Sequence, residues 1–168
     1  NVLTFYNEVI KVLDNISNQY QVVSNLLFVD DGSTDSTSEV VKKLALEHPE
    51  KVSYIVLSRN FGKEAALYAG FCHSKADYTA LMDVDLQDPP ELLTDMYLGI
   101  KNEGFDCVAA RRKNRVGEPL IRSFFAKIFY YVIRRLSGLE IVDGARDFRL
   151  INKQMLNAIL SIQESNRF

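Results

Sequence analysis

The sequence is poor in cysteine and in long apolar runs, and both shortages narrow the kinds of protein that it can encode. Of its 168 residues only Cys72 and Cys107 are cysteines, and they fall in a helix-like and a strand-like segment. Neither a disulfide framework nor a cysteine metal cluster is expected, and a reducing compartment is the default. No run of about 18 apolar residues and no signal peptide is visible, so no membrane-spanning helix is expected within these residues.

Two further absences exclude other classes of domain. The Gly-x-Gly-x-x-Gly pattern that a dinucleotide-binding fold places after its first strand is missing, and there is neither an internal repeat nor a low-complexity tract. What is present is 47% hydrophobic and 25% charged residues, typical of a soluble globular domain with one core. We expect residues 1–168 to form a single domain, cut from a longer protein.

Charge is divided unevenly along the chain, although the net charge is only −2. Residues 1–105 carry 8 Lys and Arg against 16 Asp and Glu, a net charge of −8, whereas residues 106–168 carry 12 against 6, a net charge of +6. A basic half can bind nucleic acid, acidic lipid headgroups or a phosphorylated substrate, and charge alone does not choose among them.

Apolar periodicity predicts strands and helices in alternation. Strands are expected over 2–5, 22–29, 52–57, 78–82 and 105–110, and helices over 9–16, 36–47, 64–73 and 90–102. A long aromatic-rich helix follows Pro119, a loop-strand segment covers 143–150, and Asn152 is expected to cap a closing helix. This order predicts an α/β fold with a mostly parallel central sheet and helices on both faces.

The strand at 78–82 leads into an acidic turn that holds Asp83, Asp85 and Asp88. Asp83 and Asp85 can turn toward one cation, while Val84 between them points into the core. Two carboxylates with substrate phosphate oxygens are a common way to hold Mg²⁺ or Mn²⁺. Asp88 precedes Pro89, and we expect it to cap the next helix.

Other strand ends carry charges that suit a nucleotide-diphosphate sugar. Asp30 and Asp31 can accept hydrogen bonds from a base N–H or from ribose hydroxyls, and Lys63 and Arg111 could add positive charge near a leaving diphosphate.

The late segment GARDFRL offers a carboxylate for the opposite side of the anomeric carbon. Asp143 and Asp147 are both candidates because they lie beside arginines that could hold an anionic acceptor. An ion pair within this segment is the equally acceptable structural alternative.

At these residues the sequence resembles the family 2 inverting glycosyltransferases of GT-A fold, a Rossmann-like nucleotide-diphospho-sugar transferase fold. More narrowly, it resembles the polyprenyl-phosphate branch of bactoprenol glucosyltransferases and dolichol-phosphate mannose synthases. The motifs cover nearly all of the chain and are YNE at 6–8, VDDGSTD at 29–35, SRNFGKEAAL at 58–67, DVDLQDPPE at 83–91 and DFRL at 147–150. VDDGSTD is common to the whole superfamily, whereas DVDLQDPPE together with RNFGKEAAL is specific.

The resemblance implies roles for individual positions. It places Tyr6, Glu8 and Asp30 at the nucleoside, and Arg111 near phosphate. It makes Asp147 the base-like carboxylate. The metal, Mg²⁺ or Mn²⁺, and the diphosphate would be held by three residues: Asp83, Asp85 and Gln87.

The implied reaction is metal-dependent transfer of a hexose to polyprenyl (undecaprenyl) phosphate at the cytoplasmic face of the cell membrane. The DVDLQDP and DFRL segments favour glucose, from a UDP-linked rather than a GDP-linked donor. Membrane attachment would come from segments outside these residues, no nucleic-acid partner is expected, and a homo-oligomer is left open.

Some features differ from the family pattern, and other readings compete with it. Thr4 stands where the family usually has proline, and the first strand looks clipped. A phosphoacceptor receiver domain would share the acidic opening LLFVDDGS, but it needs a lysine after its fifth strand. A haloacid-type phosphatase needs Thr or Val where Gln87 stands. A fragment that binds nucleotide without turnover is the remaining alternative.

Overall fold

The computed structural model describes residues 1–111 and 145–162. The elements in chain order are α1 (Val2–Tyr20), β1 (Leu26–Asp30), α2 (Thr37–Glu47), β2 (Val52–Val56), α3 (Lys63–His73), β3 (Tyr78–Leu81), α4 (Leu92–Glu103), β4 (Cys107–Arg111), β5 (Ala145–Asn152) and α6 (Lys153–Ser161). The helix expected after Pro119 and the candidate Asp143 lie outside the described residues. None of the helices described is long and apolar enough to cross a membrane.

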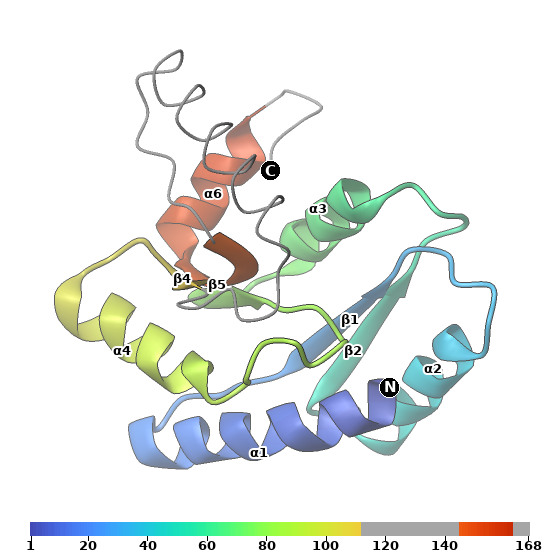
Figure 1. Cartoon of the computed structure of the whole chain (residues 1–168), viewed down its shortest axis with the longest axis horizontal. Coiled ribbons are helices and arrows are strands. Elements are labelled where there is room, and N and C mark those ends of the chain that lie inside the picture. Colours follow the sequence, from blue (N-terminus) through green and yellow to red (C-terminus); the bar gives the residue numbers. More distant parts are fainter. Residues whose placement is uncertain (112–144, 163–168) are drawn as a thin grey trace, which may run out of the picture.

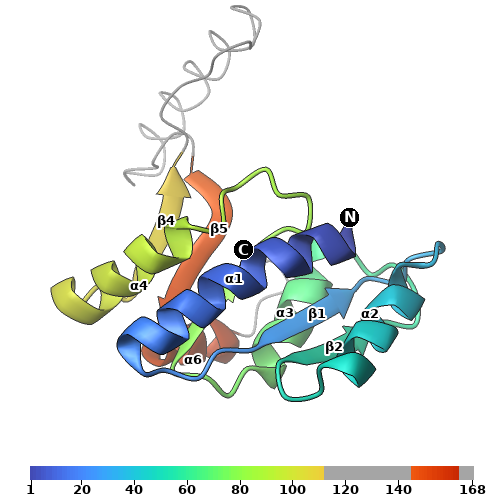
Figure 2. The same ribbon diagram turned by 90° about the horizontal axis from the view of Figure 1, so that it is seen from below.

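The strands lie between two layers of helices, with α1, α2 and α4 on one side and α3 and α6 on the other (Figures 1 and 2). β1 and β2 form a parallel pair, in register from Leu26 opposite Val52 to Asp30 opposite Val56. β5 lies between β3 and β4 and runs antiparallel to both. The α/β class with helices on both faces is therefore confirmed, but the late strand runs against its neighbours rather than parallel to them.

β5 is central because both of its faces are apolar. Phe148 and Leu150 point into the main core and are 1% and 6% exposed. Ile151 points the other way and packs with Phe71 of α3 and Leu156 of α6 in a second cluster. Alternation of this kind places one strand against helices on both sides.

Asn152, the last residue of β5, caps the helix that follows, as the sequence predicted. The Asn152 side-chain oxygen accepts a hydrogen bond from the Met155 N–H at 2.8 Å, which starts α6 as predicted.

The strand expected over residues 2–5 is wrong, because the chain is helical from Val2. Phe5 continues the helical spacing of Val9, Val12 and Ile16, and all four side chains are buried in the same core. The Phe5 N–H bonds to the Asn1 carbonyl at 3.0 Å and closes the first turn. The apolar run at residues 2–5 is too short to show a periodicity of its own. Its conformation is decided by the packing of Phe5 in the core together with the rest of the helix.

The first helix runs from Val2 to Tyr20 and so extends beyond both ends of the expected range 9–16. The later elements lie close to their predicted ranges, with one clear shift at the second predicted strand. β1 begins at Leu26 rather than at residue 22, and the Val23 side chain is 97% exposed. The prediction began the strand too early because it treated the apolar Val23 as a core residue, although apolar side chains are also common on protein surfaces.

Gly32 allows the loop after β1 to cross the loop after β2 at very short range. Its φ is +69°, and a Cβ at this position would lie 2.4 Å from the carbonyl carbon of Arg59. Both the backbone conformation and the space therefore require glycine here. The crossing joins two strand ends that carry predicted site residues.

We predict that Gly32→Ala destabilises the protein more than Gly104→Ala does. Gly104 also has a positive φ, +74°, but nothing lies within 4 Å of its hypothetical Cβ, so it is a matched control. Positive φ should cost each variant about 1–2 kcal/mol, and overpacking against the Arg59 backbone should cost Gly32→Ala roughly a further 1–3 kcal/mol. Urea denaturation of both variants measures the difference, and equal losses would contradict the close approach.

Candidate active site

The antiparallel register of β5 brings two predicted site carboxylates face to face. Leu81 at the end of β3 pairs with Arg149, and the same register continued by two residues places Asp83 opposite Asp147. The sequence predicted both acids but not their apposition, because the alternation of strands and helices does not reveal the direction of β5. Like charges directly opposite one another are destabilising unless a cation lies between them.

Lys63 provides that cation. Its ammonium Nζ lies 2.9 Å from Asp83 Oδ2 and 2.6 Å from Asp147 Oδ2, and all three side chains are about half exposed. The hydrogen bond from Lys63 lowers the pKa of the Asp147 carboxyl, and Arg149, 3.3 Å from Asp147 Oδ1, lowers it further. The bond to Asp147 correspondingly raises the pKa of Lys63.

The loop after β3 turns its acids outward and its apolar residues inward. Asp83, Asp85 and Gln87 are exposed, whereas Val84 and Leu86 pack against the core. This confirms the alternation expected from the spacing. Asp85 Oδ1 accepts the Gln87 N–H at 3.0 Å, and Leu86 has a positive φ of 56°.

Asp88 does not cap a helix, contrary to the prediction. It accepts a hydrogen bond from Arg146 Nη1 at 2.5 Å. The residues from Pro89 to Glu91 form turns before α4 begins at Leu92, and Glu91, the residue before the helix, makes no side-chain cap bond. The two prolines separate Asp88 from the helix, and its carboxylate is left to pair with β5.

These groups line a hollow of about 220 Å³ formed by Asp83, Asp85, Gln87, Asp88, Arg146 and Asp147. Carboxylate and amide oxygens are the donors that Mg²⁺ and Mn²⁺ prefer, so the chemistry of the lining fits such an ion. Within residues 1–111 and 145–162, no three His, Cys, Asp or Glu side chains gather closely enough to hold a metal by themselves. A cation would therefore need oxygens from a ligand to complete its coordination.

The acidic turn after β1 is tied into the fold by its own hydrogen bonds. Asp30 is 6% exposed and accepts bonds from the hydroxyls of Ser33 and Ser38. Burial alone would raise the pKa of the Asp30 carboxyl, but these bonds outweigh it and hold the pKa below its ordinary value. Ser38 was not expected to have a role, since no motif marks it.

Asp31 is a bridge between loops. Its two carboxylate oxygens accept the N–H groups of Phe61 and Gly62 at 2.8 and 2.9 Å. Gly62 immediately precedes α3, whose first residue is Lys63. Asp31 thus anchors the end of the helix that carries the bridging ammonium.

The remaining predicted residues either do not line this hollow or lie outside the described residues. Tyr6 is buried on α1 and stacks on His48, just before β2 begins, with ring centroids 5.3 Å apart. Glu8 pairs with Lys11 on the same helix at 2.9 Å. Arg111 ends β4, and Asp143 is not described. The nucleoside contacts of Tyr6 and Glu8 stay predictions.

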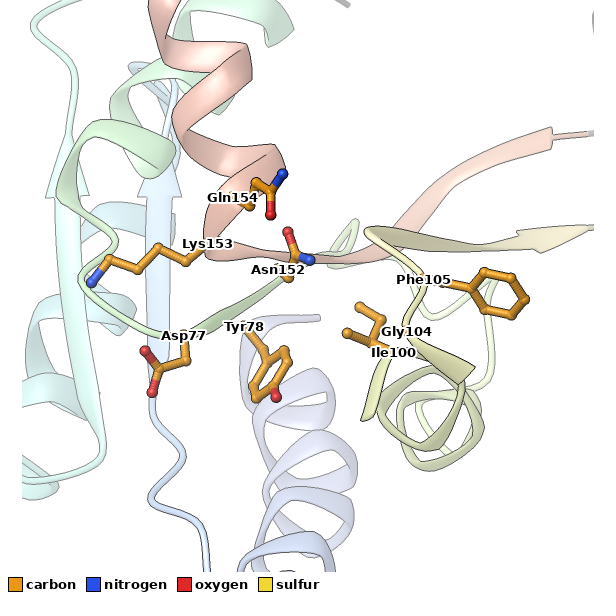
Figure 3. Close-up of a pocket in the computed structure, with 8 residues that line it drawn as sticks. All are labelled: Asp77, Tyr78, Ile100, Gly104, Phe105, Asn152, Lys153 and Gln154. Atoms are coloured by element: carbon orange, nitrogen blue, oxygen red, sulfur yellow. The ribbon is translucent and has the colours of Figure 1, made fainter. Parts of the chain in front are cut away.

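A second hollow lies at the opposite end of strands β3 and β5. It measures about 290 Å³ and is lined by Asp77, Tyr78, Ile100, Gly104, Phe105, Asn152, Lys153 and Gln154. Figure 3 shows the Phe105 ring directed away from the other labelled side chains. It gathers no group of acids comparable to the first hollow.

Comparison with known proteins gives a family and several relatives. The family described as "Glycosyl transferase family 2" matches residues 2–160. The Bacillus subtilis protein CsbB is 40% identical over 168 residues, which are 100% of this chain and 49% of that protein. A bactoprenol glucosyl transferase of Shigella phage SfV is 34% identical over 143 residues, 85% of this chain and 46% of that protein. The chain therefore spans about half the length of the curated relatives that it matches.

Solved structures agree on the fold. A mannosyltransferase from Pyrobaculum calidifontis, solved with GDP-Man and Mn²⁺, aligns with a TM-score of 0.54 at 18% identity, covering 89% of this chain and 43% of its own. Glucosyl-3-phosphoglycerate synthase from Mycobacterium tuberculosis aligns with a TM-score of 0.52 at 22% identity, covering 92% and 54%. These neighbours confirm the GT-A fold. With the match over residues 2–160, the chain belongs to glycosyl transferase family 2.

Proposed function

We propose that the protein transfers a hexose from a nucleotide-diphosphate sugar to polyprenyl phosphate, and that the donor is UDP-glucose. The observation that carries the proposal is that Asp83, Asp85 and Asp147 line one hollow, where Lys63 bridges Asp83 and Asp147. The names of relatives, a bactoprenol glucosyl transferase and an undecaprenyl-phosphate 4-deoxy-4-formamido-L-arabinose transferase of Salmonella, support the lipid acceptor. Family membership argues against the receiver-type alternative.

Three residues would hold the metal and the diphosphate: Asp83, Asp85 and Gln87. Their exposed oxygens lie on one side of the loop, which leaves room for phosphate oxygens to complete an octahedron. A bound Mg²⁺ or Mn²⁺ would supply Lewis-acid stabilisation of the leaving diphosphate. In this proposal Lys63 and Arg111 add positive charge around the same phosphates.

Asp147 would orient the acceptor rather than remove a proton from it. Its pKa is lowered by Lys63, so near neutral pH it is a weak base. A monophosphate ester has a second pKa of about 6, so a polyprenyl phosphate is already largely dianionic near pH 7. Asp147 and Arg149 can therefore position a nucleophile that needs no activation. Asp143 stays a second candidate for this position.

The nucleoside would bind beside the first acidic turn. Asp30 fixes the shape of that turn through Ser33 and Ser38, and in this proposal the turn borders the base or ribose. Because the acceptor is a lipid, the proposed place of action is the cytoplasmic face of the cell membrane.

We predict that UDP together with Mn²⁺ stabilises this chain, while neither alone does so fully. Selective binding at a ligand concentration of about 100 Kd adds roughly 2.7 kcal/mol of stability, which for a domain of this size raises Tm by about 5–10 °C. A thermal-shift panel with UDP, GDP and no nucleotide, each with and without Mn²⁺, measures this. A larger shift with GDP would overturn the UDP assignment, and radiolabelled transfer by the full-length protein from UDP-glucose or GDP-mannose would decide the sugar.

We predict that Asp85→Asn and Asp147→Asn separate binding from transfer. Asp85→Asn removes a metal-binding charge and should abolish the metal-dependent thermal shift. Asp147→Asn leaves the donor side intact, so it should keep that shift while transfer to polyprenyl phosphate falls by about 100-fold or more. If Asp85→Asn bound donor and Mn²⁺ as the wild type does, the metal assignment would fail.

We predict that Lys63→Gln raises the pKa of the Asp147 carboxyl toward its ordinary value, because the neutral amide cannot offset the carboxylate charge. The ion pair stabilises the wild-type fold above the unfolded carboxyl pKa of about 3.9, and this contribution is lost as pH falls through the lower folded value. Carboxyl-carbon NMR titration of Asp147 is the measurement. Lys51→Gln is the matched control, since Lys51 pairs with Asp14 at 2.7 Å, and it should leave the titration of Asp147 unchanged.

A further inference from the structure

Arg146 and Asp88 form an ion pair that is much less exposed than the pairs made by Lys63. Their side chains are 20% and 19% exposed, against 49% and 50% for Lys63 and Asp83. Arg146 Nη1 lies 2.5 Å from Asp88 Oδ1 and also donates to the Gln87 carbonyl at 3.2 Å. One guanidinium therefore donates hydrogen bonds to both a side chain and the main chain of the loop after β3. We call this contact the Arg146 latch.

The latch joins the two halves of the site just described. Arg146 directly precedes Asp147 on β5, while Gln87 and Asp88 lie further along the same loop as Asp83. Movement of the loop away from β5 would separate the acids that face one another across the hollow. The latch opposes that movement from the side of the loop next to α4, whereas Lys63 joins the opposite end of the loop.

The two cross-links differ in what a ligand would do to them. Lys63 contacts Asp83 and Asp147, which the proposed function assigns to metal and acceptor, so ligand atoms compete for the same oxygens. Arg146 contacts a carboxylate and a carbonyl that the proposed function leaves unassigned. The latch can therefore persist while the site is filled.

We infer that Arg146 is a positioning residue, which holds the loop of Asp83 and Asp85 at a fixed distance from Asp147 through Asp88 and the Gln87 carbonyl. The inference rests on the proposed function of that loop as the metal site. A guanidinium suits the task because its planar fork can donate to two acceptors at once, which a lysine ammonium on a flexible stem does less well. Groups that orient metal ligands in this way typically contribute 10–100-fold to metal affinity.

The test measures Mn²⁺ affinity by electron paramagnetic resonance with UDP present, for wild type, Arg146→Gln, Asp88→Asn and the double variant. Each single change should weaken Mn²⁺ binding about 10-fold or more, and the double variant should lose no more than the weaker-binding single one, because both changes remove the same bond. Arg146→Lys should recover part of the affinity. Unchanged affinity in Arg146→Gln, or additive losses in the double variant, would overturn the inference.

The Lys51–Asp14 pair is the control for a merely structural effect. Its Nζ–Oδ1 distance is 2.7 Å, and it joins α1 to the start of β2, away from the hollow. Lys51→Gln and Asp14→Asn should leave Mn²⁺ affinity unchanged even where they lower Tm. Equal losses of affinity in the control pair would overturn the positioning role.

A second measurement keeps the inference separate from the proposed function. Hydrogen exchange of the metal-free protein should show the Gln87 amide, which bonds to Asp85, exchanging faster in Arg146→Gln than in wild type, because the loop opens more often without the latch. Wild-type protein that binds no Mn²⁺ would contradict the proposed metal site. The latch would then be judged on exchange alone, and equal exchange in both proteins would overturn it.

Discussion

The ammonium of Lys63 between two opposed carboxylates is the interaction on which the arrangement of this site depends. The register of β3 and β5, continued two residues beyond Leu81, brings Asp83 opposite Asp147, and the Lys63 ammonium between them offsets their repulsion. The position of the ammonium depends in turn on Asp31, whose carboxylate holds the two amides that precede α3. Asp31 therefore helps to place the ammonium that lies between Asp83, after β3, and Asp147, on β5.

The sequence predicts the parts of this site better than it predicts their assembly. The strands that became β2 and β3, and the acids that follow β3, are recognisable because each strand is a short apolar run bounded by turn residues. The direction of β5 cannot be predicted from its own residues, because it depends on how the strand packs between the helices on its two apolar faces. The apposition of Asp83 and Asp147 could therefore not be predicted from the sequence. Asp88 was assigned to a helix cap because Pro89 suits a first turn, but a tertiary contact with Arg146 outweighed that local preference.

The acidic turns at the two strand ends serve different physical purposes. Asp30 and Asp31 use their oxygens on serine hydroxyls and backbone amides, so they mainly fix the shape of the turn and of the loops around it. Asp83, Asp85 and Gln87 are exposed and keep oxygens available to a ligand. The acids after β1 thus fix the backbone around the site, whereas those after β3 offer exposed charge. A charged ligand would therefore bind to groups whose surroundings are already held in place.

Leu86 has a consequence for how such a site is presented. It adopts a left-handed backbone conformation, which costs a non-glycine residue roughly 1–2 kcal/mol, yet its side chain packs against the core and offsets that cost. Packing of the Leu86 side chain against the core therefore helps to stabilise the bend of the loop. The curve that presents positions 83, 85 and 87 therefore does not depend on their charged and polar side chains alone. In this short segment the apolar residues Val84 and Leu86 hold the backbone, and the residues that alternate with them present their polar groups to solvent.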